Sequence, residues 1–335
     1  MAGCSDGVEL IIADLVATEL DVTSHQQLRE RRGAVGAMNK VENFRWPEAT
    51  TTKPLFRLLL VSLAIGATTI AAVFLFAVSI GLAQVTGAAF PTVAALEDVP
   101  GTVGTEYAIQ GTHAVLFALV ALAVLVATMI VYQRRASSLL APSGSIWIFY
   151  GAMGVLIAVV AQGVPSIYWL AGEKVGDMPL FRALSTGVGI RYLLSNALFL
   201  LVMAAAEEIV FRGALLHVSR TFTERVWMLC IFNGLLFSAA HSSFDPVPFL
   251  ARFASGMLWT WLTLRTGSIA FAVASHWVGN LYISLFVTPV SLASDEGSTW
   301  FDLLAELSTV ALTVGLLLLV IHRVGPFRAL KHSTV

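Results

Sequence analysis

The chain has 335 residues, of which 57% are hydrophobic and only 12% are charged. Soluble domains carry about 25% charged residues, so this composition indicates an integral membrane protein. The 20 Lys and Arg residues nearly balance the 21 Asp and Glu residues, which argues against a nucleic-acid-binding protein. The cysteines, Cys4 and Cys230, are too few for a disulfide framework or a cysteine-based zinc site.

Long apolar runs follow one another along the chain. A helix needs about 20 apolar residues to cross the ~30 Å core of a bilayer. Such runs occupy residues 58–82, 113–132, 146–170, 192–218, 226–243, 247–264, 269–290 and 303–321. We therefore predict an all-α fold, a polytopic transmembrane helix bundle of about eight spans. The loop between the fifth and sixth runs is short, so seven spans is the alternative.

Lys and Arg residues gather on one side of these spans. Most of them precede the first span or follow an even-numbered span, whereas the opposite loops are acidic. The positive-inside rule then places both termini in the cytosol. We expect no cleavable signal peptide, because residues 1–56 lack a short apolar core with a small-residue cleavage site. Met38 is an alternative start residue to Met1.

The predicted organisation has four parts. Residues 1–56 form a flexible polar tail in the cytosol, residues 57–189 hold three spans and their loops, residues 190–290 form the bundle of spans four to seven, and residues 291–335 hold the last span and a basic cytosolic tail. The third part is of most interest, because it carries polar residues inside apolar runs.

Two adjacent carboxylates interrupt span four. Glu207 and Glu208 are followed by Arg212, and ionisable groups in a membrane cost several kcal/mol unless they are paired or hydrated. Glu208 and Arg212 stand four residues apart, so they share a helix face and can pair. Glu207 points ~100° away around the helix and is free to face another group.

Spans five and seven each carry a polar stripe with a spacing of four residues. Span five has Asn233, Phe237 and His241, and span seven has His276, Asn280 and Ser284. At ~1.5 Å per residue, Glu207, His241 and His276 lie ~15–24 Å below the cytosolic ends of their spans. Because polar groups in lipid find one another, we predict that these three residues share a cavity.

The residue types in this cavity fit the hydrolysis of an amide bond. A carboxylate and a histidine can activate a water molecule between them, and a second histidine with an asparagine can stabilise the resulting oxyanion. Glu207, His241 and His276 could instead supply three zinc ligands with an open fourth position, although the chain has no His-Glu-x-x-His motif. A transporter is a further alternative, but the chain shows no internal repeat and no pair of broken helices.

These motifs resemble the signature of the CPBP (Abi) family, which comprises type II CAAX-prenyl endopeptidases and bacteriocin-processing enzymes. The resemblance covers roughly residues 190–290 and rests on Glu207-Glu208-x-x-x-Arg212, Phe237-x-x-x-His241 and His276-x-x-x-Asn280. It implies that Glu207 is the general base for the attacking water, with His241 assisting. It also implies an oxyanion site at His276 and Asn280, and supporting roles for Glu208, Arg212 and Phe237.

The resemblance therefore implies an intramembrane glutamic endopeptidase of the CAAX-protease type that needs no cofactor. Its implied partners are the lipid bilayer and a peptide or protein substrate at the membrane, lipidated peptides among them. Two alternatives stay open. One is a zinc-dependent protease that uses Glu207, His241 and His276 as ligands. The other is a non-proteolytic binding or immunity protein, because the family also includes members that act in self-immunity or as scaffolds.

Overall fold

The computed structural model describes residues 103–140, 147–172, 178–241, 244–289 and 298–323, together with residues 56, 59–63, 66–67, 70 and 74. These residues form helices joined by turns, and the described ranges contain no strand, in agreement with the predicted all-α fold. Residues 49–319 form one unit, to which all the packing below belongs, and residues 1–48 with 320–335 form another. Most of the predicted polar tail, Met38 included, lies outside the described residues.

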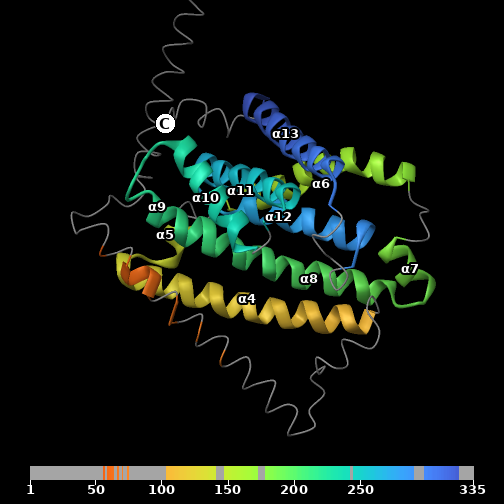
Figure 1. The fold of residues 1–335 in the computed structure, drawn as a ribbon, viewed down its shortest axis with the longest axis horizontal. Helices are drawn as coiled ribbons and strands as arrows, with labels where there is room; N and C mark the ends of the chain where they lie inside the picture. The colour runs from red at the N-terminus through yellow and green to blue at the C-terminus, as the bar shows by residue number, and fades with distance from the viewer. Residues whose placement is uncertain are drawn as a thin grey trace, which may run out of the picture. The chain divides into compact units, whose positions relative to one another are not determined.

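The helices can be followed in chain order in Figure 1. They are α4 (Val103–Tyr132), α5 (Ala136–Leu140), α6 (Trp147–Gly172), α7 (Pro179–Ser185), α8 (Gly189–Glu208), η3 (Ile209–Leu215), α9 (Leu216–Ser219), α10 (Val226–Ala240), α11 (Pro246–Thr266), α12 (Ala270–Tyr282), η4 (Ile283–Val287) and α13 (Trp300–Arg323). The segments η3 and η4 are π-helical and continue α8 and α12 without a break. Each predicted span from the second to the eighth coincides with one of these helical runs, and the first lies mostly outside the described residues.

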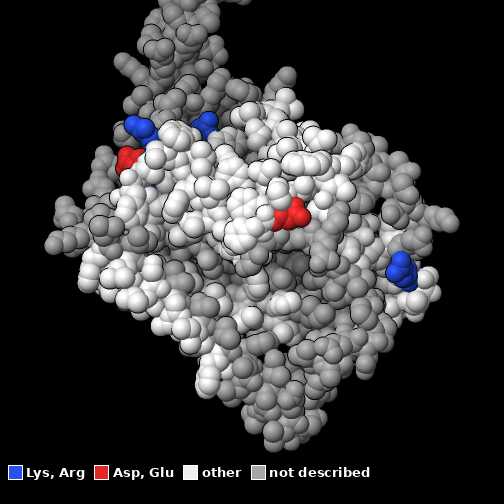
Figure 2. Space-filling model, viewed as in Figure 1, with Lys and Arg blue, Asp and Glu red and all other residues white. Residues whose placement is uncertain are grey.

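The protein is an integral membrane protein. Among the described residues, four helices are long and apolar enough to cross a membrane, namely Gln110–Tyr132, Gly189–Ser219, Ala270–Val287 and Trp300–Val320. Helix α11 is not among them, because Arg252, Arg265 and several threonines lower its hydropathy. The count of eight spans therefore stays a prediction. Figure 2 shows only scattered charged side chains on the described part of one face, as expected for a surface against lipid.

Helix α12 lies at the centre of the packing. The most extensive helix pairs are α4 with α8, α6 with α12, and α10 with α11, and α12 also contacts both α8 and α11. Figure 1 shows α4 running alongside α8, while α10, α11 and α12 lie close together on the other side of α8. This arrangement brings the polar residues of α8, α10 and α12 into one region.

Two glycines let α10 and α11 approach closely. A Cβ atom on Gly234 would lie 2.8 Å from Cγ of Met257 and 2.9 Å from the carbonyl oxygen of Phe253, and one on Gly256 would lie 3.0 Å from Cα of Gly234. Small residues at such contacts are typical of membrane helices, because packing replaces the hydrophobic effect there. Near this contact the Gly256 carbonyl accepts a hydrogen bond from Arg212, a residue of η3.

A buried polar cluster joins α4, α8 and η4 away from the carboxylates. The Gln110 side chain donates to Oδ1 of Asn196 at 2.8 Å, and the Ser284 hydroxyl donates to the same atom. The Tyr192 hydroxyl donates to the Ser284 carbonyl at 2.7 Å. Gln110 and Asn196 are fully buried, so their hydrogen bonds satisfy groups that lipid could not.

Several basic residues share one end of this unit. The rings of Tyr132 and His217 lie 4.5 Å apart, and the Ile269 amide donates to the Leu140 carbonyl at 3.0 Å. These contacts place the last turn of α4, helix α9 and the α11–α12 turn at the same end. The connections there carry Arg134, Arg135, Arg220 and Arg225, and Arg265 lies in the last turn of α11.

We expect Gly234→Ala to destabilise the protein, because its Cβ would meet a backbone carbonyl of α11. Overpacking of this kind costs about 1–3 kcal/mol. Thermal unfolding in detergent measures the effect. Gly151→Ala is the matched control, because nothing lies within 4 Å of a Cβ at that position in α6. Equal unfolding temperatures for the two variants would contradict the proposed helix contact.

Candidate active site

The site begins where α8 changes its winding. Residues Ile209–Leu215 form a π-helix, whereas the sequence predicted a regular helix across this region. Single π-helical turns inside α-helices occur frequently at functional sites. Leu140 of α5 packs against this turn, since a Cβ on Gly213 would lie 2.7 Å from its Cδ2. The wider turn carries Arg212 inward.

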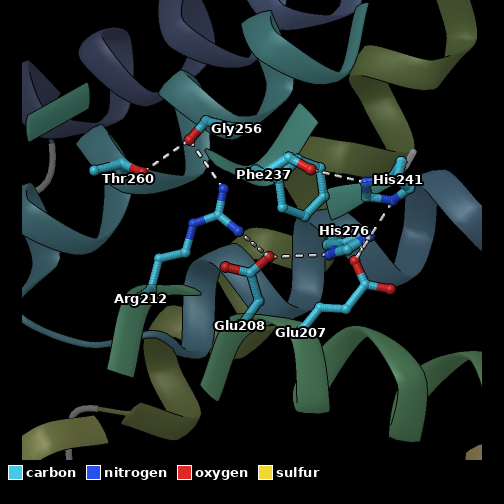
Figure 3. A network of polar contacts seen from close by, with 8 residues as sticks. All are labelled: Glu207, Glu208, Arg212, Phe237, His241, Gly256, Thr260 and His276. Carbon is cyan, nitrogen blue, oxygen red and sulfur yellow. Dashed lines mark hydrogen bonds and ion pairs between the residues drawn. The ribbon is translucent and has the colours of Figure 1, made fainter. Parts of the chain in front are cut away.

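Arg212 forms a buried ion pair with Glu208. Nη1 of Arg212 lies 3.0 Å from Oε1 of Glu208, and both side chains have no exposed surface. Nη2 donates to the Gly256 carbonyl of α11 at 2.9 Å, and Thr260 donates to the same oxygen at 2.8 Å. The guanidinium carbon also lies 4.8 Å from the ring centre of Phe237. The polar contacts, drawn in Figure 3, give each charge partners inside the protein, while Nε of Arg212 and Oε2 of Glu208 have no hydrogen-bond partner among the described residues.

His276 of α12 lies between the two carboxyl groups (Figure 3). Its Nδ1 is 3.0 Å from Oε1 of Glu208, and its Nε2 is 3.9 Å from Oε2 of Glu207. The ring stacks on Trp259 of α11 with 4.0 Å between ring centres and 18° between planes. Because the Glu208 carboxylate accepts hydrogen bonds, Nδ1 of His276 is the protonated nitrogen in this contact.

Glu207 faces the opposite side of the site from Arg212. Its Oε2 lies 3.9 Å from Nε2 of His241 as well as 3.9 Å from Nε2 of His276. That oxygen is buried and has no hydrogen-bond partner among the described residues. His241 caps the end of α10, and its Nδ1 lies 2.9 Å from the Phe237 carbonyl. A carbonyl only accepts, so Nδ1 of His241 carries the proton.

These two tautomers have a chemical consequence. With Nδ1 protonated, a neutral His241 and a neutral His276 each present the lone pair of Nε2 toward Oε2 of Glu207. Three acceptor atoms then face one another, and separations of 3.9 Å are too long for direct hydrogen bonds. The arrangement favours a donor between them, either a water molecule or an added proton.

Phe237 is the aromatic centre of the site. Its ring lies 4.8 Å from the His241 ring, 5.9 Å from the His276 ring and 5.4 Å from the Trp259 ring, and it also packs edge-on against Phe211. It is 2% exposed, so it separates the ion pair from water. The side of the site formed by Glu207 and His241 is more open to solvent, since the His241 side chain is 32% exposed and that of Glu207 is 12% exposed.

The remaining polar stripe residues lie elsewhere. Asn280 is half-buried one turn after His276, and its side chain makes no hydrogen bond with the described residues. Ser284 belongs to the buried cluster around Asn196. The Asn233 side chain donates to the Leu229 carbonyl at 2.9 Å. The structure thus brings Glu207, Glu208, Arg212, Phe237, His241 and His276 together, and gives Asn280 no contact that tests its predicted role.

Three groups near the site lie outside the sequence motifs. Trp259 and the Gly256 carbonyl of α11 hold His276 and Arg212, and Glu306 of α13 accepts a hydrogen bond from Ser255. A backbone carbonyl leaves no mark in a sequence. Glu306, by contrast, is a carboxylate inside an apolar run, the same signal that identified Glu207.

The described residues offer no preformed metal site. No group of three His, Cys, Asp or Glu side chains among them is arranged to hold a metal ion. Ligands of a tetrahedral zinc ion lie about 3.4 Å apart for bonds of ~2.05 Å, which is closer than the 3.9 Å between Glu207 and either histidine. The zinc alternative, like the expected absence of a cofactor, stays a prediction.

Comparison with known proteins agrees with the motifs. Residues 189–282 match the Rce1-like family, described as type II CAAX prenyl endopeptidase Rce1-like. This match confirms the predicted resemblance. The Rce1-like segment, residues 189–282, contains both carboxylates, Arg212, both histidines and Asn280, whereas α4, α6 and α13 lie outside it.

A Bacillus subtilis (strain 168) protein described as "Uncharacterized protein YyaK" is also similar to this chain. The two are 32% identical over 104 residues, which cover 29% of this chain and 35% of that protein. The chain thus matches about a third of the length of this relative. No solved structure matches the chain.

We expect Arg212→Leu to destabilise the fold by about 3–5 kcal/mol, because it leaves the Glu208 carboxylate buried without its cation. Thermal unfolding in detergent measures this loss. The double variant Glu208→Leu/Arg212→Leu should recover part of it, because it removes both charges. Arg134→Leu, at an exposed position after α4, is the control. An Arg212→Leu variant as stable as that control would contradict a structural role for the ion pair.

Proposed function

We propose that this protein is an intramembrane endopeptidase that hydrolyses a peptide bond of a membrane-associated substrate with water activated by Glu207. One observation carries the proposal. The unpartnered Oε2 of Glu207 lies 3.9 Å from Nε2 of both His241 and His276, inside the segment that matches CAAX prenyl endopeptidases. A buried carboxylate without a hydrogen bond is unfavourable unless it serves a bound water or ligand.

Glu207 is the general base of this reaction. A water molecule held by its Oε2 and by Nε2 of His241 is oriented for attack on a carbonyl carbon. Glu207 takes one proton as the water oxygen bonds to that carbon. It then passes the proton to the nitrogen of the leaving amine as the C–N bond breaks. His241 orients the water, because the Phe237 carbonyl fixes its ring with Nε2 toward Glu207.

His276 stabilises the oxyanion together with Asn280. The Glu208 carboxylate holds the proton on Nδ1 of His276, so Nε2 donates a hydrogen bond only when the ring carries a second proton. Glu207 and Glu208 carry two negative charges against the one positive charge of Arg212. A proton on His276 neutralises the cluster and places a charged donor beside the reacting carbonyl. Asn280, one turn further along α12, supplies the second donor.

Glu208, Arg212 and Phe237 support these groups. The ion pair fixes the oxygen that His276 contacts, and the Phe237 ring keeps water away from the ion pair. Water that enters is therefore confined to the side of Glu207 and His241. We propose that no metal ion takes part, since Glu207, His241 and His276 already complete the acid–base chemistry.

The substrate is a peptide or protein that the enzyme meets at the membrane, and a lipid-modified peptide is one such substrate. The Rce1-like segment and the four membrane-capable helices support this class of partner. Both termini are proposed to be cytosolic, because the basic end formed around Tyr132, His217 and Ile269 would then face the cytosol.

Glu207→Gln should lower the rate of cleavage by about 10²–10⁴-fold, because an amide cannot accept the proton from water. His241→Ala should also lose activity. A quenched library of lipidated and unlipidated peptides, presented to the protein in nanodiscs, measures the rates. Glu224→Gln, in the exposed connection before α10, is the matched control for loss of a carboxylate and should cleave normally.

The same assay separates the alternatives when it is repeated with a strong zinc chelator. Cleavage that chelation stops and zinc restores would assign Glu207, His241 and His276 to a metal site. A wild-type protein that binds library peptides and cleaves none would contradict proteolysis and favour the binding or immunity protein.

Asn280→Ala should lower kcat by about 10²–10³-fold with little change in KM, because the oxyanion forms only in the transition state. Asn233→Ala is the control, since that amide bonds within α10 and away from Glu207. Steady-state kinetics on a cleaved library peptide measures both variants. Equal kcat values for Asn280→Ala and the wild type would remove Asn280 from the oxyanion site.

A further inference from the structure

A third carboxylate approaches the site from a helix that the motifs do not include. Glu306 lies in α13, about 9 Å along the axis from the start of that helix at Trp300. Its side chain accepts a hydrogen bond from Ser255 of α11. Ionisable residues inside membrane helices are expensive and mark functional sites more often than not. Glu306 lies outside residues 189–282, so the family comparison gives it no role.

Ser255 connects Glu306 to the ion pair through one peptide unit. Ser255 is 5% exposed and directly precedes Gly256, whose carbonyl accepts hydrogen bonds from Arg212 and Thr260. A displacement of α11 at this position therefore moves the oxygen that holds Arg212. Arg212 in turn holds Glu208, and Oε1 of Glu208 contacts both Arg212 and His276.

The same part of α11 also supports His276 directly. Trp259 lies one turn after Ser255 and stacks on the His276 ring at 4.0 Å. Ser255 and Trp259 thus lie one turn apart on α11, and the first binds Glu306 while the second stacks on His276.

We propose that Glu306 is a positioning residue for this site, which holds α11 through Ser255 so that the Gly256 carbonyl and Trp259 keep Arg212 and His276 in place. The proposal rests on the proposed proteolytic function. It assigns α13 a role in the site, although the base, the histidine that orients the water and the oxyanion donors all come from α8, the end of α10 and α12. Glu306 does not touch the substrate in this account.

Variants of Glu306 and Ser255 distinguish a role of the hydrogen bond between them from a role of the Glu306 charge. Glu306→Gln keeps an oxygen that accepts from the Ser255 hydroxyl, so it should retain kcat within about threefold. Glu306→Leu and Ser255→Ala each remove the hydrogen bond and should lower kcat by about tenfold with KM unchanged, because small displacements of catalytic groups slow the chemical step. Ser308→Ala is the control, since that hydroxyl bonds to Leu304 within α13.

A double-mutant cycle then tests whether Glu306 acts through Ser255. The variant Ser255→Ala/Glu306→Leu should be no slower than either single variant, because all three lack the same contact. Multiplied losses in the double variant would overturn the proposal. A Glu306→Gln variant as slow as Glu306→Leu would also overturn it, since the charge and not the hydrogen bond would then matter.

A second readout does not depend on activity. The ¹⁵N NMR signals of His276, assigned with His276→Gln in detergent, report the hydrogen bond between its Nδ1 and Glu208. We expect them to shift in Glu306→Leu and Ser255→Ala and to stay unchanged in Glu306→Gln and Ser308→Ala. If the wild type cleaves no peptide but these shifts occur, the proteolytic function fails and the positioning role stands. Unchanged signals in Glu306→Leu would overturn the positioning role.

Discussion

The buried ion pair of Glu208 and Arg212 is the constraint on which the site depends. Both side chains have no exposed surface, so a membrane-buried guanidinium must find all its partners inside the protein. The π-helical turn of η3 carries Arg212 toward α11, and the close glycine contact of α10 and α11 brings the Gly256 carbonyl within 2.9 Å. The π-helical winding of η3 and the close packing of α10 against α11 therefore both help to give the Arg212 guanidinium a partner.

This constraint gives two neighbouring glutamates different roles. Glu208 is occupied by Arg212 and by Nδ1 of His276, which fixes the orientation and tautomer of that ring. Glu207 projects from another face of the helix, keeps an unpartnered oxygen, and faces Nε2 of His241 and His276. The different contacts of the two carboxylates thus follow from helix geometry, because adjacent residues point ~100° apart.

Much of this arrangement could be predicted from the sequence. Apolar runs identified the helices, and the spacing of four residues correctly paired Glu208 with Arg212. The rise per residue along each helix correctly predicted that Glu207 lies near His241 and His276. Periodicity alone could not find the π-helical turns, which depend on tertiary contacts such as that of Leu140 with Gly213, nor the stacking of Trp259 on His276. It also grouped Ser284 with His276, whereas the η4 segment directs Ser284 to Asn196.

The central claim is that Glu207 activates the water that cleaves the peptide bond. The most direct test is single-turnover cleavage of a membrane-anchored peptide in H₂¹⁸O, in metal-free nanodiscs, read by mass spectrometry of the products. The account predicts one ¹⁸O atom in the new carboxyl group with the wild-type protein and no product with Glu207→Gln. Labelled product formed by Glu207→Gln at the wild-type rate, or cleavage that appears only when zinc is added, would contradict it.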